Sequence, residues 1–332
     1  MHGETSVDRG QYPDAVAPWD DLAWRQSALA WAERALAARG RPRARLLAVR
    51  VRPWSVLVRM SAAGGPDVWL KANPPASAFE AGLTEALARW VPGHVLEPLA
   101  VDVERGWSLF PHGGTLFREV HPDGTGERAW AEALHQYAVV QRALVSRVEE
   151  ITRLGVPDAR TAVLPAVFDR VVGRNTVLDT GTRTALHALR PRLVRWCEEL
   201  DALGVPDSLD HSDLHDGQLF TPAPGRFTFF DWGDASVSHP FCSLFVPLNN
   251  ARERYGPQAL PRLRDAYLDA WTGTGPTTAE LRRGAALARH LGAIGRACSW
   301  DRLFPEASRG LTAMTEAGAA RSLRQLLADP AL

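Results

Sequence analysis

The sequence predicts an α+β protein with two lobes, a small strand-rich N-terminal lobe and a larger, mainly helical C-terminal lobe. Three observations support this prediction. Strand-like sequence fills residues 44–72, helical periodicity dominates the chain after residue 127, and two short strands near residues 211–234 interrupt the helices. We place the boundary in the segment Pro111-His-Gly-Gly114, so that the lobes comprise residues 1–111 and 112–332.

The N-terminal lobe begins with a helix over residues 20–38, where Leu22, Leu29, Ala32 and Leu36 recur at helical spacing. A glycine and a proline follow it closely and end it. The apolar segment after residue 44 forms the first two strands, turns at Ala62-Ala-Gly-Gly-Pro66 and then resumes as a further strand. The remaining predicted elements of this lobe are a helix over 77–90 and strands over 95–103 and 106–110.

The C-terminal lobe is predicted from long stretches of helical periodicity. The expected helices span residues 127–150, 182–204, 257–272, 278–304 and 306–328. Neither an internal repeat nor a low-complexity tail is found along the 332 residues.

Composition limits the possible classes of partner. The chain is 45% hydrophobic and 23% charged, as in ordinary globular proteins. Its 38 basic and 38 acidic residues cancel, so no net field favours nucleic acid or an anionic membrane. The first residues lack a charged, then apolar leader, and no apolar run is long enough to cross a bilayer. We therefore expect a cytoplasmic protein, with its oligomeric state left open.

Residues 211–234 carry the most chemical information. Asp213 follows His211 by two positions, Gln218 lies five residues further on, and a run of aromatic residues ends at Asp231 in Asp-Trp-Gly. Phosphoryl transfer from a nucleotide uses one carboxylate beside the acceptor hydroxyl and a second on magnesium, with an oxygen donor from the same loop helping to hold the metal. Asp213, Asp231 and Gln218 can fill these three places. The spacing is that of the kinase pattern H-x-D-x-x-x-x-N followed by D-x-G, with Gln in place of Asn.

A single lysine is the second clue. Of the 38 basic residues, 37 are arginines, and Lys71 lies in the strand-like run Asp67-Val-Trp-Leu-Lys-Ala72. A compact ammonium can touch phosphates where a planar guanidinium would not fit. A strand lysine upstream of the Asp213 loop is also where kinases carry their phosphate-binding lysine.

These motifs together resemble the aminoglycoside phosphotransferase family, which includes small-molecule kinases of choline, homoserine and sugars. His211-Ser-Asp-Leu-His215 matches the family's catalytic loop H-x-D-L-H-x-x-N, and Phe230-Asp-Trp-Gly-Asp234 resembles its metal-binding strand end. The similarity covers about residues 45–250. It implies a protein-kinase-like fold, ATP or GTP as co-substrate in the cleft between the lobes, Mg²⁺, and a small-molecule hydroxyl as acceptor. Antibiotic resistance is a family-level expectation.

For the catalytic loop, the resemblance implies that Asp213 accepts or orients the proton of the acceptor hydroxyl. Asp231 would bind magnesium, with Gln218 as a further ligand. His211 would orient the loop by hydrogen bonding rather than take part in chemistry, and a structural role is also preferred for His215.

For the nucleotide, the resemblance implies that Lys71 contacts the α- and β-phosphates and is held by a glutamate of the following helix. Glu80 and Glu85 both lie on that helix, and Glu80 is preferred because it is near the helix start.

The adenine edge would meet the backbone of a hinge at Leu109, Phe110 and Pro111. Ser55 lies between the first two strands, where kinases fold a glycine-rich loop over the phosphates, but no G-x-G-x-x-G is present. Ser55 therefore marks either a short phosphate-contacting turn or an ordinary hairpin.

Two departures from the family pattern leave an alternative open. Gln218 is one methylene longer than Asn, which moves its oxygen by roughly 1.5 Å. The family often places an aspartate beyond the metal-binding strand to brace the catalytic loop, and here that position is Ser243. The alternative is a catalytically degenerate, nucleotide-binding or regulatory member of the same fold. A protein kinase is a more distant possibility, because no activation segment with A-P-E follows Asp231.

Overall fold

The computed structural model describes residues 7–42, 44–61, 65–122 and 124–328, which divide into two compact units. Unit 1 comprises Met1–Gly114 and Asp301–Thr312, and unit 2 comprises Thr115–Trp300 and Ala313–Leu332. The prediction divided the chain after residue 111 and assigned everything beyond to the helical lobe. The return of Asp301–Thr312 to unit 1 departs from this division. Its physical reason is burial: Phe304 is in the core of unit 1, and its N–H donates to the Pro53 carbonyl oxygen at 2.8 Å.

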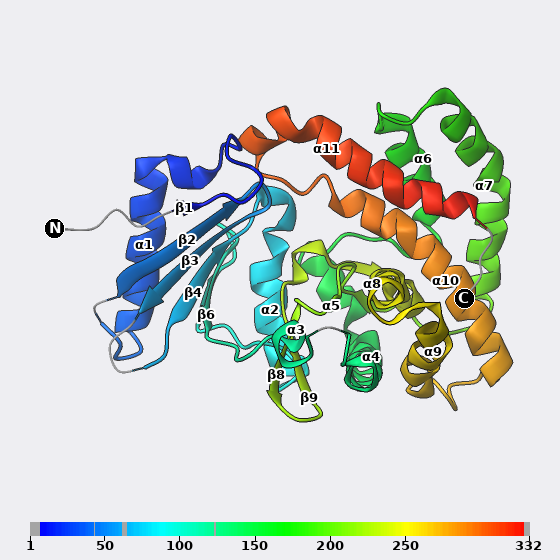
Figure 1. Cartoon of the computed structure of the whole chain (residues 1–332), viewed down its shortest axis with the longest axis horizontal. Coiled ribbons are helices and arrows are strands. Elements are labelled where there is room, and N and C mark those ends of the chain that lie inside the picture. Colours follow the sequence, from blue (N-terminus) through cyan, green and yellow to red (C-terminus); the bar gives the residue numbers. More distant parts are fainter. Residues whose placement is uncertain (1–6, 43, 62–64, 123, 329–332) are drawn as a thin grey trace. The chain divides into compact units, whose positions relative to one another are not determined.

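Unit 1 is built on a six-stranded sheet with the order β1-β2-β3-β4-β6-β5 (Figure 1). All neighbouring strands are antiparallel except β1, which runs parallel to β2. The strands are β1 (Val7–Asp8), β2 (Arg45–Arg52), β3 (Ser55–Ser61), β4 (Val68–Ala72), β5 (Ala100–Asp102) and β6 (Trp107–Pro111). The sequence predicts each of them except β1, whose two residues are too few to show alternation.

Two helices accompany this sheet, and Figure 1 shows α1 to the left of the strands and α2 to their right. α1 (Leu22–Ala37) begins at Asp21, whose side chain accepts hydrogen bonds from two N–H groups of the first turn. Its small and apolar face packs with alternate residues of β2, β3 and β4 in the core of unit 1. α2 (Phe79–Trp90) begins with Glu80 in its first turn.

Unit 2 is mainly helical, as the sequence predicts. Its helices are α3 (Phe117–Val120), α4 (Glu127–Leu144), α5 (Val148–Arg153), α6 (Leu164–Arg174), α7 (Thr180–Asp201), α8 (Phe245–Tyr255), α9 (Leu260–Asp269) and α10 (Thr278–Ser299), and the later residues of α11 (Pro305–Arg324). The predicted helix over 127–150 is in fact two helices separated by a 3-10 turn. The sequence did not predict α6 and α8. In the part of the chain that the structure describes, no helix combines the length and the apolar character needed to span a membrane.

Two short strand pairs of unit 2 frame the loop that contains Asp213. β7 (Ser208–Asp210) pairs antiparallel with β10 (Ser236–Ser238), and β8 (Leu219–Ala223) forms a hairpin with β9 (Arg226–Phe229). The loop over residues 211–218 joins β7 to β8, and Asp231 follows β9. The predicted interruption of the helices by strands is therefore confirmed, with one pair more than expected.

α10 approaches the 3-10 helix Pro240–Leu244 closely because its facing residues are small. A Cβ on Gly292 would lie 2.5 Å from the Cys242 carbonyl oxygen, and one on Gly284 would lie 2.3 Å from the Leu203 side chain. Because real side chains do not approach backbone so closely, glycine is what lets α10 pack at this distance. The end of α10 is thereby brought beside the loop that contains Asp213.

Candidate active site

Lys71 and Glu80 form a buried ion pair in unit 1. The Lys71 Nζ lies 2.7 Å from Glu80 Oε1 and 2.5 Å from Oε2, and the two residues are 8% and 1% exposed. The Asn73 side-chain amide donates a further hydrogen bond to Glu80 Oε2 at 2.5 Å. A buried pair of this kind is strongly interdependent, since removal of one partner leaves the other charge buried and uncompensated.

Strand alternation explains why Lys71 meets this glutamate. Leu70 and Ala72 of β4 belong to the core of unit 1, so Lys71 between them faces the other side of the sheet. Glu85, the other candidate, forms an exposed ion pair with Arg89 one turn later. The structure therefore brings Lys71 together with Glu80, the glutamate that the sequence favours.

Ser55 and the predicted hinge at Leu109 and Phe110 both lie in the sheet of unit 1. Ser55 is the first residue of β3, directly after a two-residue hairpin turn, and is buried. Leu109 and Phe110 both lie inside β6, paired with β4. The Leu109 carbonyl oxygen already accepts a hydrogen bond from the Leu99 N–H at 2.6 Å. One lone pair of this oxygen is therefore used within the sheet, and the hinge at Leu109, Phe110 and Pro111 stays a prediction.

In unit 2, His211 fixes the catalytic loop to its surroundings. Its backbone N–H donates to the Tyr137 hydroxyl, and its Nε2 lies 2.9 Å from the Phe230 carbonyl oxygen. Because a carbonyl only accepts, Nε2 carries the proton. Burial lowers the pKa of His211 to about 4, so the ring is neutral at physiological pH. The ring thus ties the loop to the residue before Asp231, in keeping with an orienting role.

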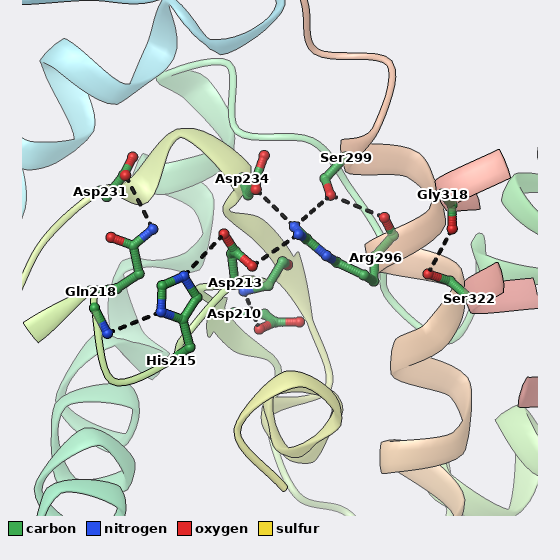
Figure 2. A network of polar contacts seen from close by, with 12 residues as sticks. Asp210, Asp213, His215, Gln218, Asp231, Asp234, Arg296, Ser299, Gly318 and Ser322 are labelled. Atoms are coloured by element: carbon green, nitrogen blue, oxygen red, sulfur yellow. Dashed lines mark hydrogen bonds and ion pairs between the residues drawn. The ribbon is translucent and has the colours of Figure 1, made fainter. Parts of the chain in front are cut away.

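Asp213 lies in the middle of a charged network (Figure 2). Its Oδ1 is 3.0 Å from Nη2 of Arg296, and its Oδ2 is 4.0 Å from Nε2 of His215. Nη1 of the same arginine bonds to Asp234 Oδ2 at 2.9 Å. Burial raises the pKa of Asp213 to about 6, the Arg296 charge opposes the rise, and the charges of Asp234 and Asp231 add to it.

The hydrogen bonds to His215 define its tautomer. The Gly217 N–H donates to His215 Nδ1 at 3.0 Å, and Arg118 Nη2 lies 3.3 Å from the same atom. Both partners are donors, so Nδ1 is the acceptor and the Nε2 proton faces Asp213. Gly217 leaves the necessary room, because a Cβ there would lie 1.2 Å from Arg118 Nη2. Asp216, next to His215, forms ion pairs with Arg118 and Arg254 and so helps to hold this loop in place.

Gln218 and Asp231 meet side chain to side chain. The Gln218 amide nitrogen donates to Asp231 Oδ2 at 3.1 Å, and the Phe230 N–H donates to the Gln218 backbone oxygen at 3.1 Å. Asp231 has a left-handed backbone with φ 67°, a conformation that Asp and Asn tolerate better than most residues. Although Gln218 is longer than the asparagine of the family pattern, its side chain still bonds to Asp231.

This donor set fits Mg²⁺. Among the described residues, no group of three or more His, Cys, Asp or Glu side chains is gathered as a metal site. Mg²⁺ does not need one, because it commonly binds one or two carboxylates and completes its octahedron with phosphate oxygens and water. The Asp231 carboxylate and the Gln218 amide oxygen are hard oxygen donors of the required type.

Asp210 is a site residue that the sequence reasoning missed. The Ser243 hydroxyl donates to Asp210 Oδ1 at 2.7 Å, and the Ser212 N–H donates to the same oxygen at 2.7 Å. Burial raises the pKa of Asp210. The bracing carboxylate, expected where Ser243 stands, is thus supplied from the strand before the loop. A signal was present, since an aspartate directly precedes His211.

Comparisons with known proteins identify the family of the chain. The family model described as "Phosphotransferase enzyme family" matches residues 70–283. No curated protein matches the sequence significantly.

Solved structures with similar folds have low sequence identity to this chain. The macrolide 2'-phosphotransferase MphH from Brachybacterium faecium is 16% identical, with 92% of this chain and 99% of that chain covered and a TM-score of 0.55. The choline kinase LicA from Streptococcus pneumoniae is 13% identical, with coverages of 89% and 98% and a TM-score of 0.57. The GDP and kanamycin complex of APH(2")-IIIa is 16% identical, with coverages of 81% and 88% and a TM-score of 0.52. These likenesses show the fold and confirm the kinase-like class that the sequence predicts.

Proposed function

The chain belongs to the phosphotransferase enzyme family, and from that premise we propose that it transfers the γ-phosphate of ATP or GTP to a hydroxyl group of a small molecule. The observation that carries the proposal is the catalytic loop of unit 2. This loop presents Asp213 and, five residues later, Gln218 bonded to Asp231. These are the groups that phosphoryl transfer needs for the acceptor and for the metal.

Asp213 would accept or orient the proton of the acceptor hydroxyl. Its pKa of about 6 leaves the carboxylate ionised at neutral pH and close to the value that suits a general base. Asp231 and Gln218 would hold Mg²⁺, and Lys71, kept in place by Glu80, would contact the nucleotide phosphates. When bound, the metal neutralises phosphate charge and orients the transferred group.

The two departures from the family pattern do not favour the inactive alternative. The Gln218 side chain bonds to Asp231. Asp210 supplies a carboxylate that braces the loop, and the Ser243 hydroxyl donates a hydrogen bond to it. Asp213 also lies in ion-pair contact with Arg296 and His215. These contacts support an active enzyme.

For the acceptor, we propose a neutral or modestly charged polyol, sugar or antibiotic. Residues 251–332 contain 12 Arg against 8 Asp and Glu, a net charge of +4, which disfavours a strongly cationic acceptor such as an aminoglycoside. The similar folds do not decide the class, because their names refer to a macrolide, to choline and to kanamycin. Antibiotic resistance is one possible outcome of this proposal. Because ATP and GTP are supplied in the cytoplasm, we propose that location.

The test has two stages. Calorimetry with ATP and with GTP in millimolar magnesium, repeated with a chelator, measures nucleotide binding. A nucleotide-consumption screen against hydroxyl-bearing antibiotics and metabolites then finds the acceptor, with Asp213→Asn as the control that lowers turnover by about 10²–10⁴-fold. Failure to bind either nucleotide in the presence of magnesium would contradict the proposal.

A further inference from the structure

Arg296 is the one arginine of α10 that bonds to Asp213 in the part of the chain that the structure describes, and its guanidinium is held on several sides. Nη2 bonds to Asp213 Oδ1 at 3.0 Å, and Nη1 bonds to Asp234 Oδ2 at 2.9 Å and to the Ser299 hydroxyl at 3.1 Å (Figure 2). All three charged side chains are between 19% and 27% exposed. One planar cation therefore bridges two carboxylates, a geometry that suits arginine and not lysine.

The position of Arg296 is fixed by packing as well as by charge. Its guanidinium carbon lies 5.2 Å from the centre of the Trp300 ring. Gly318 of α11 packs against that ring, because a Cβ on Gly318 would lie 2.4 Å from Trp300 Cδ2. The close approach of α10 at Gly292 supports the same helix end. These contacts give Arg296 few alternative orientations.

The charges around Asp213 make this arginine important. Asp231 and Asp234 are anionic neighbours, and burial also disfavours the charged form of Asp213. Two groups favour the charged form of Asp213, namely Arg296 from α10 and His215 from the same loop as Asp213. Arg296 is the closer of the two donors, at 3.0 Å against 4.0 Å.

We propose that Arg296 is a positioning residue for phosphotransfer, which holds the Asp213 carboxylate in one orientation for the acceptor hydroxyl. This inference rests on the proposed function. Arg296 acts through Asp213 and does not itself need to touch the acceptor or the nucleotide. It also favours the ionised carboxylate, the form that can accept a proton.

The first test does not depend on any activity. Wild type, Arg296→Met and the control Arg283→Met are labelled with ¹³C at the aspartate side-chain carboxyl and titrated without magnesium or nucleotide. The Asp213 resonance is the one that Asp213→Asn removes. Loss of a cation at this distance should raise the titration midpoint by about one to three pH units in Arg296→Met. Arg283 lies on the same helix but pairs with Glu199 at the surface, so its replacement should leave the midpoint unchanged. An unchanged midpoint in Arg296→Met overturns the inference.

The second test uses an acceptor found by the screen. Arg296→Met should lower kcat by about 10²-fold, the size of effect that a misplaced catalytic group produces. Nucleotide affinity measured by calorimetry should stay at the wild-type value. Arg296→Lys keeps the charge but cannot bridge both carboxylates, so its kcat should lie between those of wild type and Arg296→Met. If Arg296→Met does not fold, Arg296→Lys takes its place in this test.

The outcomes separate the two levels of the argument. A wild-type kcat in both Arg296 variants, or a parallel loss of nucleotide affinity, overturns the positioning role. If the wild-type protein consumes no nucleotide with any acceptor, the proposed function fails, while the carboxyl titration still shows whether Arg296 controls Asp213.

Discussion

Ser243 donates a 2.7 Å hydrogen bond to Asp210, and this bond joins the 3-10 helix Pro240–Leu244 to β7, the strand before the loop that contains Asp213. The Ser243 hydroxyl also lies 3.2 Å from the Tyr137 hydroxyl and accepts from Gln141 at 2.9 Å. Tyr137 in turn accepts from the His211 N–H. The loop that contains Asp213 is therefore braced by a buried polar network. The family often has an aspartate where this chain has Ser243, and here the bracing carboxylate is Asp210, which precedes the loop.

Asp210→Ala should destabilise the protein more than Asp210→Asn. The alanine leaves the Ser212 N–H and the Ser243 hydroxyl buried without their acceptor, which costs about 1–3 kcal/mol per unsatisfied group. Asparagine keeps an oxygen at the same position and should remain close to wild type. Urea unfolding of the three proteins measures the difference, and equal stability of the two variants would show that Asp210 is not a brace.

Asp213→Asn should stabilise the protein at high pH and leave it unchanged at low pH. The pKa of Asp213 is about 6 in the folded protein, above its ordinary value of 3.8, so the folded state binds this proton more tightly than the unfolded state does. The corresponding stability is present below the unfolded pKa and is lost as the pH rises through 6. The amide has no charge to bury, so its advantage above that pH is on the order of 3 kcal/mol. Urea unfolding at about pH 4 and about pH 8 tests this, and a pH-independent difference would refute the raised pKa.

Glu80→Ala should destabilise unit 1 and weaken nucleotide binding, whereas the matched Glu85→Ala should do neither. Glu80 is the buried partner of Lys71, and loss of one partner of a buried pair costs about 3–5 kcal/mol. Glu85 forms an exposed pair with Arg89, and such pairs contribute about 0–1 kcal/mol. Thermal unfolding and calorimetry with ATP separate the two effects. Similar behaviour of the two variants would contradict the role given to Glu80.

Asp231→Asn should abolish magnesium-dependent nucleotide binding while preserving the fold. Asparagine tolerates the left-handed backbone at this position and has nearly the same shape, but it removes the one carboxylate that we assign to Mg²⁺. Asp234→Asn serves as a control, because Asp234 bonds to Arg296 and we give it no metal-binding role. Calorimetry with and without a chelator provides the measurement. Metal-dependent binding that survives in Asp231→Asn would assign the metal to other residues.

The features that the sequence predicted correctly depend on residues close together in the chain. The strand-like run over residues 67–72 placed Lys71 on a strand, and the strand character around residues 211–234 placed the loop that contains Asp213 between strands. Arg296, which it missed, acts across a long sequence separation. Arg296 and Asp213 are far apart in the chain, and no local pattern links them.

The missed helices have a local cause. α6 and α8 contain Pro165 and Pro247 among their first residues, which obscures the helical pattern in the sequence. Proline is well tolerated in the first turn of a helix, where the backbone N–H has no intrahelical partner. The pairing of the Leu109 carbonyl oxygen with the Leu99 N–H has no local signal, since the sequence does not show which carbonyl of β6 meets this segment.

Because Lys71 is the only lysine of the chain, amine-directed labelling has one side-chain target. Lys71 is 8% exposed and its amine is bonded to both oxygens of Glu80, so we expect reagents in solution to acylate it slowly while this ion pair is intact. The rate at which Lys71 is acylated, read by mass spectrometry, therefore reports the local opening of unit 1 in otherwise native protein. The same atom thus provides an intrinsic single-site reporter of motion, and no residue needs to be introduced to follow it.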